Sequence, residues 1–456
     1  MAERARAAFD ALEDLSGPLR IPAAERTYGR QFAQVYDYRL AVLRRRVLAA
    51  ATEMYGARPP YVERILDIPP KQLCFVIGTV YAAMRLKPDV LQEIAREVRA
   101  PLTQQSMAPQ PVPTYADPGH DELYIEDPSG RVRLVGDKVR AGGALAHLCV
   151  TGAVVGVFGA ETPDGDLEVA DLALAGPPAP RTLPGAPAGG GDDAPHILLA
   201  SGLGLGGDDA AQDMPCDLLL EWLAGALGDR VGAARISSVV LAGDSVQRTA
   251  WVPPEGARGA AAPPASALFA ELDPLLAELC ATLDTVVVLP GAQDPSSATL
   301  PQQPLLRGLL PRAAAWPNLH CVTNPAWFAL HGRAVLATAG QNVEDLQKYM
   351  VGDAAGGDAA LAMACATLRW SHVAPTAPDT LWSYPFKATD PFVLRAAPHL
   401  YVVGNQAHFA STTHAVRHGD ATHTVRVVLV PRFAATHEVV LVNMATLEPR
   451  VVAVRV

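Results

Sequence analysis

The sequence predicts a protein of mixed β and α/β class, a small β barrel followed by a larger α/β sandwich. In the first half, a strand candidate at 71–84 precedes an amphipathic helix at 88–100 and hairpins at 121–136 and 149–174, which alternate in polarity around glycine-containing turns. About five strands with one helix are typical of a closed barrel of the OB type. From residue 196 onward, short apolar runs end at turns and alternate with helical stretches, which indicates a sheet buried on both faces.

These elements divide the chain into four parts. Residues 1–58 are predicted to be helical, with the clearest helical periodicity at 36–56. Residues 59–175 form the predicted barrel. Residues 176–195 are dominated by Pro, Gly and Ala, which favours a flexible linker or loop. Residues 196–456 form the predicted sandwich.

The composition narrows the classes of function. The chain has 456 residues, a formal net charge of −10 and 50% hydrophobic residues, so it can bury a large core and its surface as a whole does not suit a DNA clamp. Its six cysteines are widely spread, which predicts buried thiols of an intracellular protein and no cysteine-based zinc site. The longest uncharged stretch, 141–160, contains five glycines, which favours paired strands over a membrane span.

A glycine-rich loop follows the first apolar run of the second half. Gly202, Gly204 and Gly207 have the spacing of a dinucleotide-binding loop, and Glu221 lies at about the distance of its ribose-binding acid. Three aspartates within 208–213 stand where the pyrophosphate would bind, and no Lys or Arg offsets them. The spacing therefore does not indicate a nucleotide site.

The order of turns suits a metallophosphoesterase layout better. In that class, the carboxyl ends of successive strands supply carboxylates and imidazoles to two metal ions. The expected motifs are Asp-x-His, Gly-Asp, Gly-Asn-His-Asp, a lone His and Gly-His-x-His. The chain has turns in the same order, at 201, 243, 291, 339 and 404.

Over several continuous sequence segments, the chain resembles the B-subunit family of replicative DNA polymerases, and within it the small subunits of DNA polymerase delta. The resemblance extends from about residue 25 to the C-terminus, through both predicted domains. The phrases that carry it include DELYIEDPSGRVRLVG (121–136), TLPQQP (299–304), TNP (323–325), AGQN (339–342) and APTAPDTLWSYPF (374–386).

The resemblance implies an OB-fold domain joined to a calcineurin-like phosphoesterase domain that is catalytically inactive. By this alignment only Asp244 remains among seven metal-ligand positions, and Gln293 replaces the His usually assigned to acid–base help. One carboxylate cannot hold two hard cations, so we expect no metal, no cofactor and no enzymatic activity. The vestigial positions are Gly202, Gly204, Asp244, Ala292, Gln293, Ala339, Asn405 and Ala407.

The resemblance also implies a role and partners. It predicts a non-catalytic scaffold in DNA replication and repair, located in the nucleus, which bridges the C-terminal cysteine-rich module of the polymerase delta catalytic subunit to a third accessory subunit. DNA would be contacted only indirectly, through the complex. Two alternatives remain open: an active metal-dependent phosphodiesterase or exonuclease, and a stand-alone OB module that binds single-stranded DNA.

Two segments are candidate interfaces. Trp382, Tyr384 and Phe386 lie in a proline-containing segment that suits either a partner groove or plain loop packing. Gln302 and Gln303 have no evident local role, so partner contact and loop bracing are equally open. For Asp244, capping of a loop or helix is an alternative to a leftover ligand role.

Four late histidines could also be considered as a metal site. No HExxH motif surrounds them, and their Thr- and Gly-containing neighbours favour loop or strand over a zinc-binding helix. They are His408, His414, His418 and His423.

Overall fold

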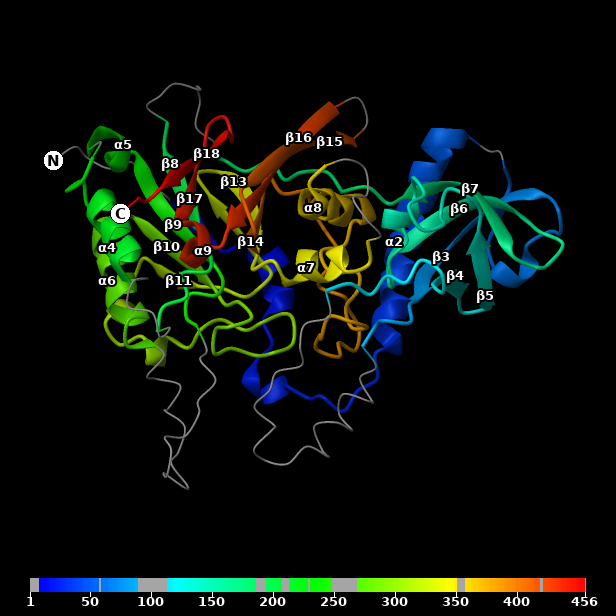
Figure 1. Cartoon of the computed structure of the whole chain (residues 1–456), viewed down its shortest axis with the longest axis horizontal. Coiled ribbons are helices and arrows are strands. Elements are labelled where there is room, and N and C mark those ends of the chain that lie inside the picture. Colours follow the sequence, from blue (N-terminus) through cyan, green and yellow to red (C-terminus); the bar gives the residue numbers. More distant parts are fainter. Residues whose placement is uncertain are drawn as a thin grey trace. The chain divides into compact units, whose positions relative to one another are not determined.

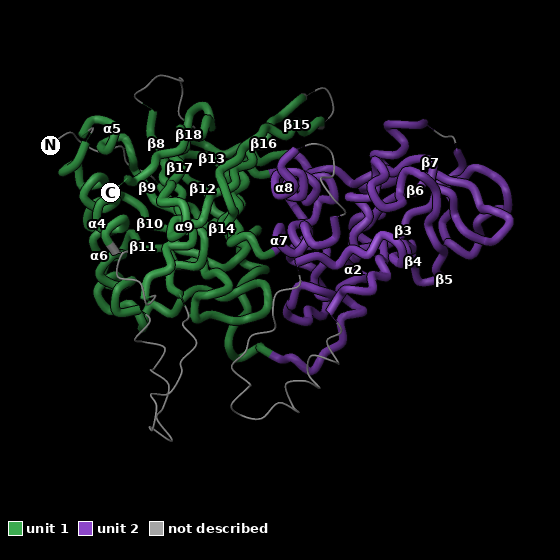
Figure 2. The backbone as a smooth tube through the Cα atoms, in the orientation of Figure 1, with its two compact units in different colours: residues 1–26, 180–341, 398–456 green, residues 27–179, 342–397 purple. Residues whose placement is uncertain are grey.

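The computed structural model divides the chain into two compact units, which Figure 2 distinguishes by colour. Unit 1 consists of Met1–Arg26, Pro180–Gln341 and Pro398–Val456, and unit 2 consists of Thr27–Ala179 and Asn342–Ala397. The described residues are 8–56, 59–88, 113–185, 194–206, 213–228, 230–247, 269–350, 357–418 and 421–455. The helix expected at 88–100 lies outside them, except for its first residue.

Unit 1 contains two six-stranded sheets (Figure 1). In spatial order, the first is β11 (Leu319–Cys321), β10 (Thr285–Leu289), β9 (Ile236–Ala242), β8 (His196–Ala200), β17 (Glu438–Asn443) and β18 (Pro449–Ala453). The second is β1 (Phe9–Asp10), β12 (Ala326–Leu330), β13 (Arg333–Thr338), β14 (Leu400–Gln406), β16 (Ala421–Pro431) and β15 (Ala410–His418). Strands β8 to β11 are mutually parallel, and β17 and β18 extend that sheet in antiparallel pairing.

Alternate residues of the central strands face two different cores. Ile197 and Leu199 belong to a cluster that joins both sheets, whereas Leu198 and Ala200 pack against helices α4 (Asp213–Leu223) and α6 (Leu272–Thr282). Both faces of β8 are therefore apolar, which explains why its sequence shows a continuous apolar run instead of alternation.

Short helices complete unit 1. They are α1 (Glu13–Ser16), α4 (Asp213–Leu223), α5 (Arg230–Ala234), α6 (Leu272–Thr282) and α9 (Phe433–Thr436), with 3-10 turns η1 (Gly17–Leu19), η2 (Ala23–Glu25), η7 (Arg307–Leu309) and η8 (Ala313–Ala315). None of the helices in the described part of the chain has both the length and the apolar character of a membrane span.

Unit 2 is built on a closed five-stranded barrel with the order β3-β4-β5-β7-β6 and a final β6–β3 pairing. This order confirms the predicted OB-type barrel. The strands are β2 (Tyr61–Val62, added beside β3), β3 (Leu73–Ala83), β4 (Glu122–Asp127), β5 (Gly130–Val135), β6 (Val154–Glu161) and β7 (Leu167–Leu174). The remaining elements are α2 (Ala33–Tyr55), α7 (Gln341–Gln347), α8 (Ala359–Trp370), η3 (Ile65–Asp67) and η4 (Ala146–Leu148).

Helix α2 packs its apolar stripe onto the barrel. Leu40, Leu43 and Val47 are buried against Phe75 and Phe158. Helical periodicity at 36–56 is thus confirmed, but the prediction of helix throughout residues 1–58 is wrong at the start. Residues 9–10 form an edge strand because they pair with β12, a partner remote in sequence.

The contacts differ from the predicted four-part division at two places, the first of which is that Met1–Arg26 belongs to unit 1 and residues 27–58 belong to unit 2. Residues 342–397, predicted to lie within the sandwich, pack with the barrel in unit 2. Tyr115 donates to the carboxylate of Asp345 at 2.9 Å, and Trp370 donates to the carbonyl of Leu148 at 3.2 Å. As a statement about domains, the division into 1–58, 59–175, 176–195 and 196–456 stays a prediction.

A buried charge cluster also joins this segment to α2. Arg39 and Asp390 are both 0% exposed, and the Arg39 Nε donates to Asp390 Oδ2 at 2.7 Å. The same guanidinium donates to the carbonyls of Gly152, Pro375 and Ala377. Nearly every donor of Arg39 is therefore used inside the unit.

His372 completes the cluster with its Nε2 at 2.9 Å from Asp390 Oδ2. Burial, and then the charge of Arg39, lower the pKa of His372 to about 4. For Asp390, burial alone would raise the pKa, but Arg39 and His372 outweigh it and hold the pKa below its usual range.

The low pKa of His372 predicts a pH dependence of stability. The unfolded chain protonates His372 below about pH 6.5, whereas the folded chain keeps it neutral, so the unfolded state binds more protons. The free energy of unfolding should fall by roughly 2 kcal/mol between pH 7 and pH 5 from this residue. Urea unfolding of the wild type and His372→Gln at both pH values measures it: the variant should lose less stability on acidification. An identical pH dependence in both proteins would contradict the assignment.

Candidate functional site

Five strand ends of unit 1 converge on one cluster of loops. Gly202, after β8, donates its N–H to the carbonyl of Gly243, after β9, at 2.8 Å. A Cβ on Gly243 would collide with the Ala339 side chain after β13 and lie 3.0 Å from the Cα of Gly291 after β10. Asn405, near the end of β14, donates through Nδ2 to the carbonyl of Ala339 at 2.9 Å. The turns picked out in the sequence are thus brought together.

The space next to Gly202, which the resemblance implies as the first ligand position, is filled by neighbouring side chains. Gly202 has φ +61°, and a Cβ there would lie 2.5 Å from Arg432 Cγ and 2.7 Å from Asn405 Oδ1. The backbone around Arg432 fixes this approach, because Phe433 and Ala434 donate to the carbonyls of Ser201 and Gly202. A side chain at 202 is therefore incompatible with the observed packing.

Asp244 lies at the centre of the loop cluster and is 6% exposed. Its Oδ1 accepts the N–H of Gln293 at 2.8 Å, and its Oδ2 lies 3.8 Å from Nη2 of Arg432. Burial raises the pKa of Asp244, which the Gln293 N–H and then the charge of Arg432 partly counteract. The contacts are those of a loop cap with a nearby guanidinium, which is the capping alternative considered from the sequence.

Asp294 is also a cap. Its two carboxylate oxygens accept the N–H groups of Val246 at 3.0 Å and Gly291 at 2.7 Å, so it ties the loop after β9 to the loop after β10. Burial raises the pKa of Asp294 to about 6, against the lowering effect of these N–H groups.

The other positions that the resemblance implies for a metal site differ in burial. Ala339 is buried, whereas Ala292, Gln293 and Ala407 are exposed. Gly204 donates its N–H to the carbonyl of Asp244 at 3.2 Å. Within the part of the chain that the structure describes, no three His, Cys, Asp or Glu side chains are grouped so that they could hold a metal ion.

Of the four late histidines, His408 precedes strand β15 and the other three lie on a hairpin. Strands β15 and β16 pair in antiparallel register from Ala410–Leu429 to His418–Ala421, which places His414 and His423 on this hairpin. The side chain of His418 lies outside the described residues.

The two glutamine candidates are buried and bonded within unit 1. Gln302 donates to the carbonyl of Gly291 at 2.9 Å and accepts from the side chains of Asn324 and Gln341. Gln303 donates to the carbonyl of Leu19 at 3.0 Å and accepts the N–H of Ile21. These contacts support the bracing alternative, because neither amide is presented to a partner.

The three aromatic candidates differ in exposure. Trp382 is 54% exposed, whereas Tyr384 and Phe386 are 4% and 8% exposed. Tyr384 accepts the N–H of Thr27 at 3.1 Å and packs edge-on against the exposed ring of Tyr28. Of the three, Trp382 alone presents a large apolar surface in this structure.

The sequence reasoning missed two residues that define the loop cluster. Arg432 directly follows the strand that ends at Pro431, and the sequence signal that could have identified it is a cation at the end of a predicted strand. Asn324 accepts the N–H of Ala339 at 3.0 Å and donates to Gln302 and Gln341. The sequence signal for Asn324 is the TNP segment (323–325), which contributes to the family resemblance but for which we predicted no structural role from the sequence.

Comparisons with known proteins agree with this architecture. Residues 31–172 match the family described as the OB-fold domain of the DNA polymerase delta subunit, and residues 197–411 match the B-subunit family of DNA polymerases alpha and epsilon. The two matches cover the barrel and most of the sandwich, in the order expected for a B-type polymerase subunit.

Relatives that are similar over their full length identify the subunit family more specifically. The DNA polymerase delta small subunit of Saccharomyces cerevisiae is 30% identical over 490 residues, covering 99% of this chain and 95% of that protein. The DNA polymerase delta small subunit of Arabidopsis thaliana and DNA polymerase delta subunit 2 of Drosophila melanogaster are each 34% identical, covering 92% and 96% of this chain and 90% and 96% of those proteins. The chain therefore belongs to the DNA polymerase delta small subunit family.

Two glycine substitutions test the packing around Gly202. Gly202→Ala and Gly206→Ala both place a Cβ at positive φ, which costs about 1–2 kcal/mol. Only Gly202→Ala meets neighbours, since a Cβ at Gly206 has nothing within 4 Å. We expect Gly202→Ala to lose a further ~1–3 kcal/mol from overpacking, measured by urea unfolding. Equal losses in the two variants would show that the space beside Gly202 is open.

Proposed function

We propose that unit 1 has the architecture of a calcineurin-like phosphoesterase whose catalytic site is lost, and that the chain is a non-catalytic scaffold of DNA polymerase delta. It bridges the C-terminal cysteine-rich module of the catalytic subunit to a third accessory subunit. Family membership supports the polymerase complex as the setting. The observation that carries the loss of catalysis is the packing at Gly202, where Arg432 and Asn405 take up the space of a ligand side chain.

The layout of unit 1 supports the phosphoesterase ancestry. Loops from five strand ends meet at one edge, which is the arrangement that a two-metal site requires. At that edge the vestigial positions are Gly202, Gly204, Asp244, Ala292, Gln293, Ala339, Asn405 and Ala407, and Asp244 is the one carboxylate among them. A guanidinium near Asp244 provides positive charge that bound metal ions would otherwise supply.

Trp382 is the candidate anchor for a partner subunit. An exposed tryptophan is a costly surface group in an isolated chain, and tryptophan is among the residues that most often dominate binding energy at interfaces. We place the chain in the nucleus, with DNA contacted through the assembled polymerase.

Assembly with purified partners tests the scaffold. The full chain should co-elute with the catalytic subunit's C-terminal module and with the third subunit. Trp382→Ala should raise the dissociation constant for one of them at least tenfold, about 1.4 kcal/mol. Trp316→Ala is a matched control, because Trp316 is exposed in unit 1. Soluble partners that never co-elute with the chain would refute the scaffold.

Activity measurements test the rival function. With manganese and either a chromogenic phosphodiester or a single-stranded oligonucleotide, the purified chain should show no turnover above the buffer rate. Turnover that disappears in Asp244→Ala would establish an active phosphodiesterase and overturn the inactive site.

A further inference from the structure

One face of the barrel carries two tyrosines and two arginines on adjacent strands. Tyr81 pairs with Tyr124 across β3 and β4, and Tyr124 pairs with Arg133 across β4 and β5. The Arg131 guanidinium lies over both rings, at 4.6 Å from the centre of Tyr81 and 5.4 Å from that of Tyr124. Aromatic rings and guanidinium groups on a barrel face are the elements with which OB folds stack single-stranded nucleic acids.

The charges on this face do not suit a phosphate backbone. Arg131 pairs with Glu126 at 2.8 Å, and Arg133 pairs with Glu122 at 3.1 Å and with Asp166 at 2.5 Å. Lys87, which lies over the Tyr81 ring, pairs with Asp379. A phosphate would have to displace a carboxylate at each of these cations. Because the carboxylates already neutralise the cations, the electrostatic attraction on which nucleic-acid binding depends is weak here.

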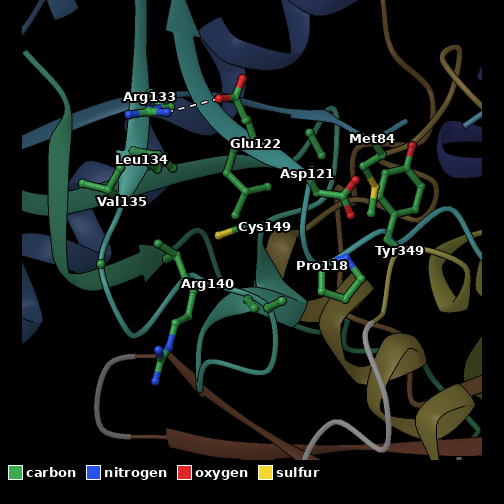
Figure 3. A pocket seen from close by; sticks show the side chains of 16 residues that line it. Met84, Pro118, Asp121, Glu122, Arg133, Leu134, Val135, Arg140, Cys149 and Tyr349 are labelled. Atoms are coloured by element: carbon green, nitrogen blue, oxygen red, sulfur yellow. Dashed lines mark hydrogen bonds and ion pairs between the residues drawn. The ribbon is translucent and has the colours of Figure 1, made fainter. Parts of the chain in front are cut away.

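A pocket of about 320 Å³ lies on the other side of these strands. Its inner wall is formed by Ala82, Leu123 and Leu134, which pair with one another across β3, β4 and β5. Each of them is the direct sequence neighbour of a residue of the outer face: Tyr81, Tyr124 and Arg133, respectively. Successive strand residues point to opposite sides, so the pocket lies at the inner side of the barrel wall. In Figure 3 the Arg133–Glu122 pair lies at the upper left, Met84 and Tyr349 at the upper right, and Cys149 below Glu122.

The inner part of the pocket offers few polar groups to a ligand. Burial raises the pKa of the Cys149 thiol to about 12, so the thiol stays neutral. The Tyr349 hydroxyl lies 3.1 Å from the Thr380 hydroxyl and within 3.5 Å of Asp379. The charged lining residues are of both signs: Asp121, Glu122, Arg133 and Arg140.

We infer that this pocket is the docking site for a polypeptide segment of a partner subunit, which inserts one bulky uncharged side chain. An aromatic or branched aliphatic side chain fits the apolar wall formed by Ala82, Leu123 and Leu134. The flanking residues of such a segment, carrying both charges, complement the mixed rim. The inference rests on the scaffold function proposed above, because the partner is a subunit of that assembly.

Methionine oxidation locates the contact in the intact protein. Met84 lines the pocket, whereas Met54 on α2 is 59% exposed and is not among the pocket residues. Hydroxyl-radical footprinting of the full chain, alone and in complex with each polymerase subunit, gives the rate of sulfoxide formation by mass spectrometry. We expect Met84 to be protected at least fivefold in one complex, with Met54 unchanged.

A cavity-filling variant tests the energetic role. Ala146 lines the pocket, so Ala146→Phe occupies the space without removing a core side chain. We expect the dissociation constant of the partner that protects Met84 to rise at least tenfold. Ala49→Phe, on an exposed position of α2, is the matched control and should change it less than twofold. If Ala146→Phe does not fold, Arg140→Glu at the rim, where the side chain is 73% exposed, should weaken the same complex and alter its salt dependence.

The outcomes separate this inference from the scaffold function. Assembly with unchanged oxidation of Met84 in every complex would overturn the docking site alone, whereas failure to assemble contradicts both proposals. A single-stranded oligonucleotide that protects Met84 and is displaced in Ala146→Phe would replace the polypeptide with a nucleic acid. Protection of Met84 that is lost on deleting residues 89–112, without any partner, would assign the pocket to the chain itself.

Discussion

The structure of unit 2 depends on one buried guanidinium. Arg39 extends from α2, ion-pairs with Asp390 and donates to carbonyls of the barrel loop at Gly152 and of the segment at Pro375 and Ala377. Removing water from two charges is costly, and the cost is offset here by close geometry and several hydrogen bonds. Because the guanidinium needs all these partners at once, α2, the barrel loop and the segment containing Asp390 can pack in only one way.

A similar constraint governs the loop cluster of unit 1, with a different outcome. At Gly202 the absence of a side chain lets Arg432 and Asn405 approach, and the positive φ suits glycine. The residues that close this space are remote in sequence from Gly202, so a side chain at position 202 would require Arg432 and Asn405 to change as well. The stability of these loops is therefore linked to the absence of a side chain at position 202.

Barrel and sandwich contribute in different ways to a scaffold. The sandwich buries its sheets on both faces and holds the loops rigid through caps such as Asp294 and Gln302. On the barrel, cations are paired with carboxylates on a face that other OB folds use for nucleic acids. Neutralising that face favours recognition of shape and apolar surface over recognition of phosphate.

The sequence by itself determined the elements whose signals are local. The apolar runs ending at 201, 243 and 291 became parallel strands, because a strand buried on both faces must be continuously apolar. The hairpin at 121–136 was equally clear, since Asp127 caps its own turn through Ser129 and Gly130.

Tertiary structure alone decided what depends on partners distant along the chain. Nothing local showed that residues 342–397 would pack with the barrel, because the Arg39–Asp390 pair spans 351 positions. Nor did the sequence show whether Gln303 meets a partner or braces the loop, since its acceptor is the carbonyl of Leu19. Hydrophobic periodicity and turn-forming residues can be recognised from residues that are neighbours in sequence. The partner of a buried charge or amide is decided only by the folding of the whole chain, because that partner is distant in sequence.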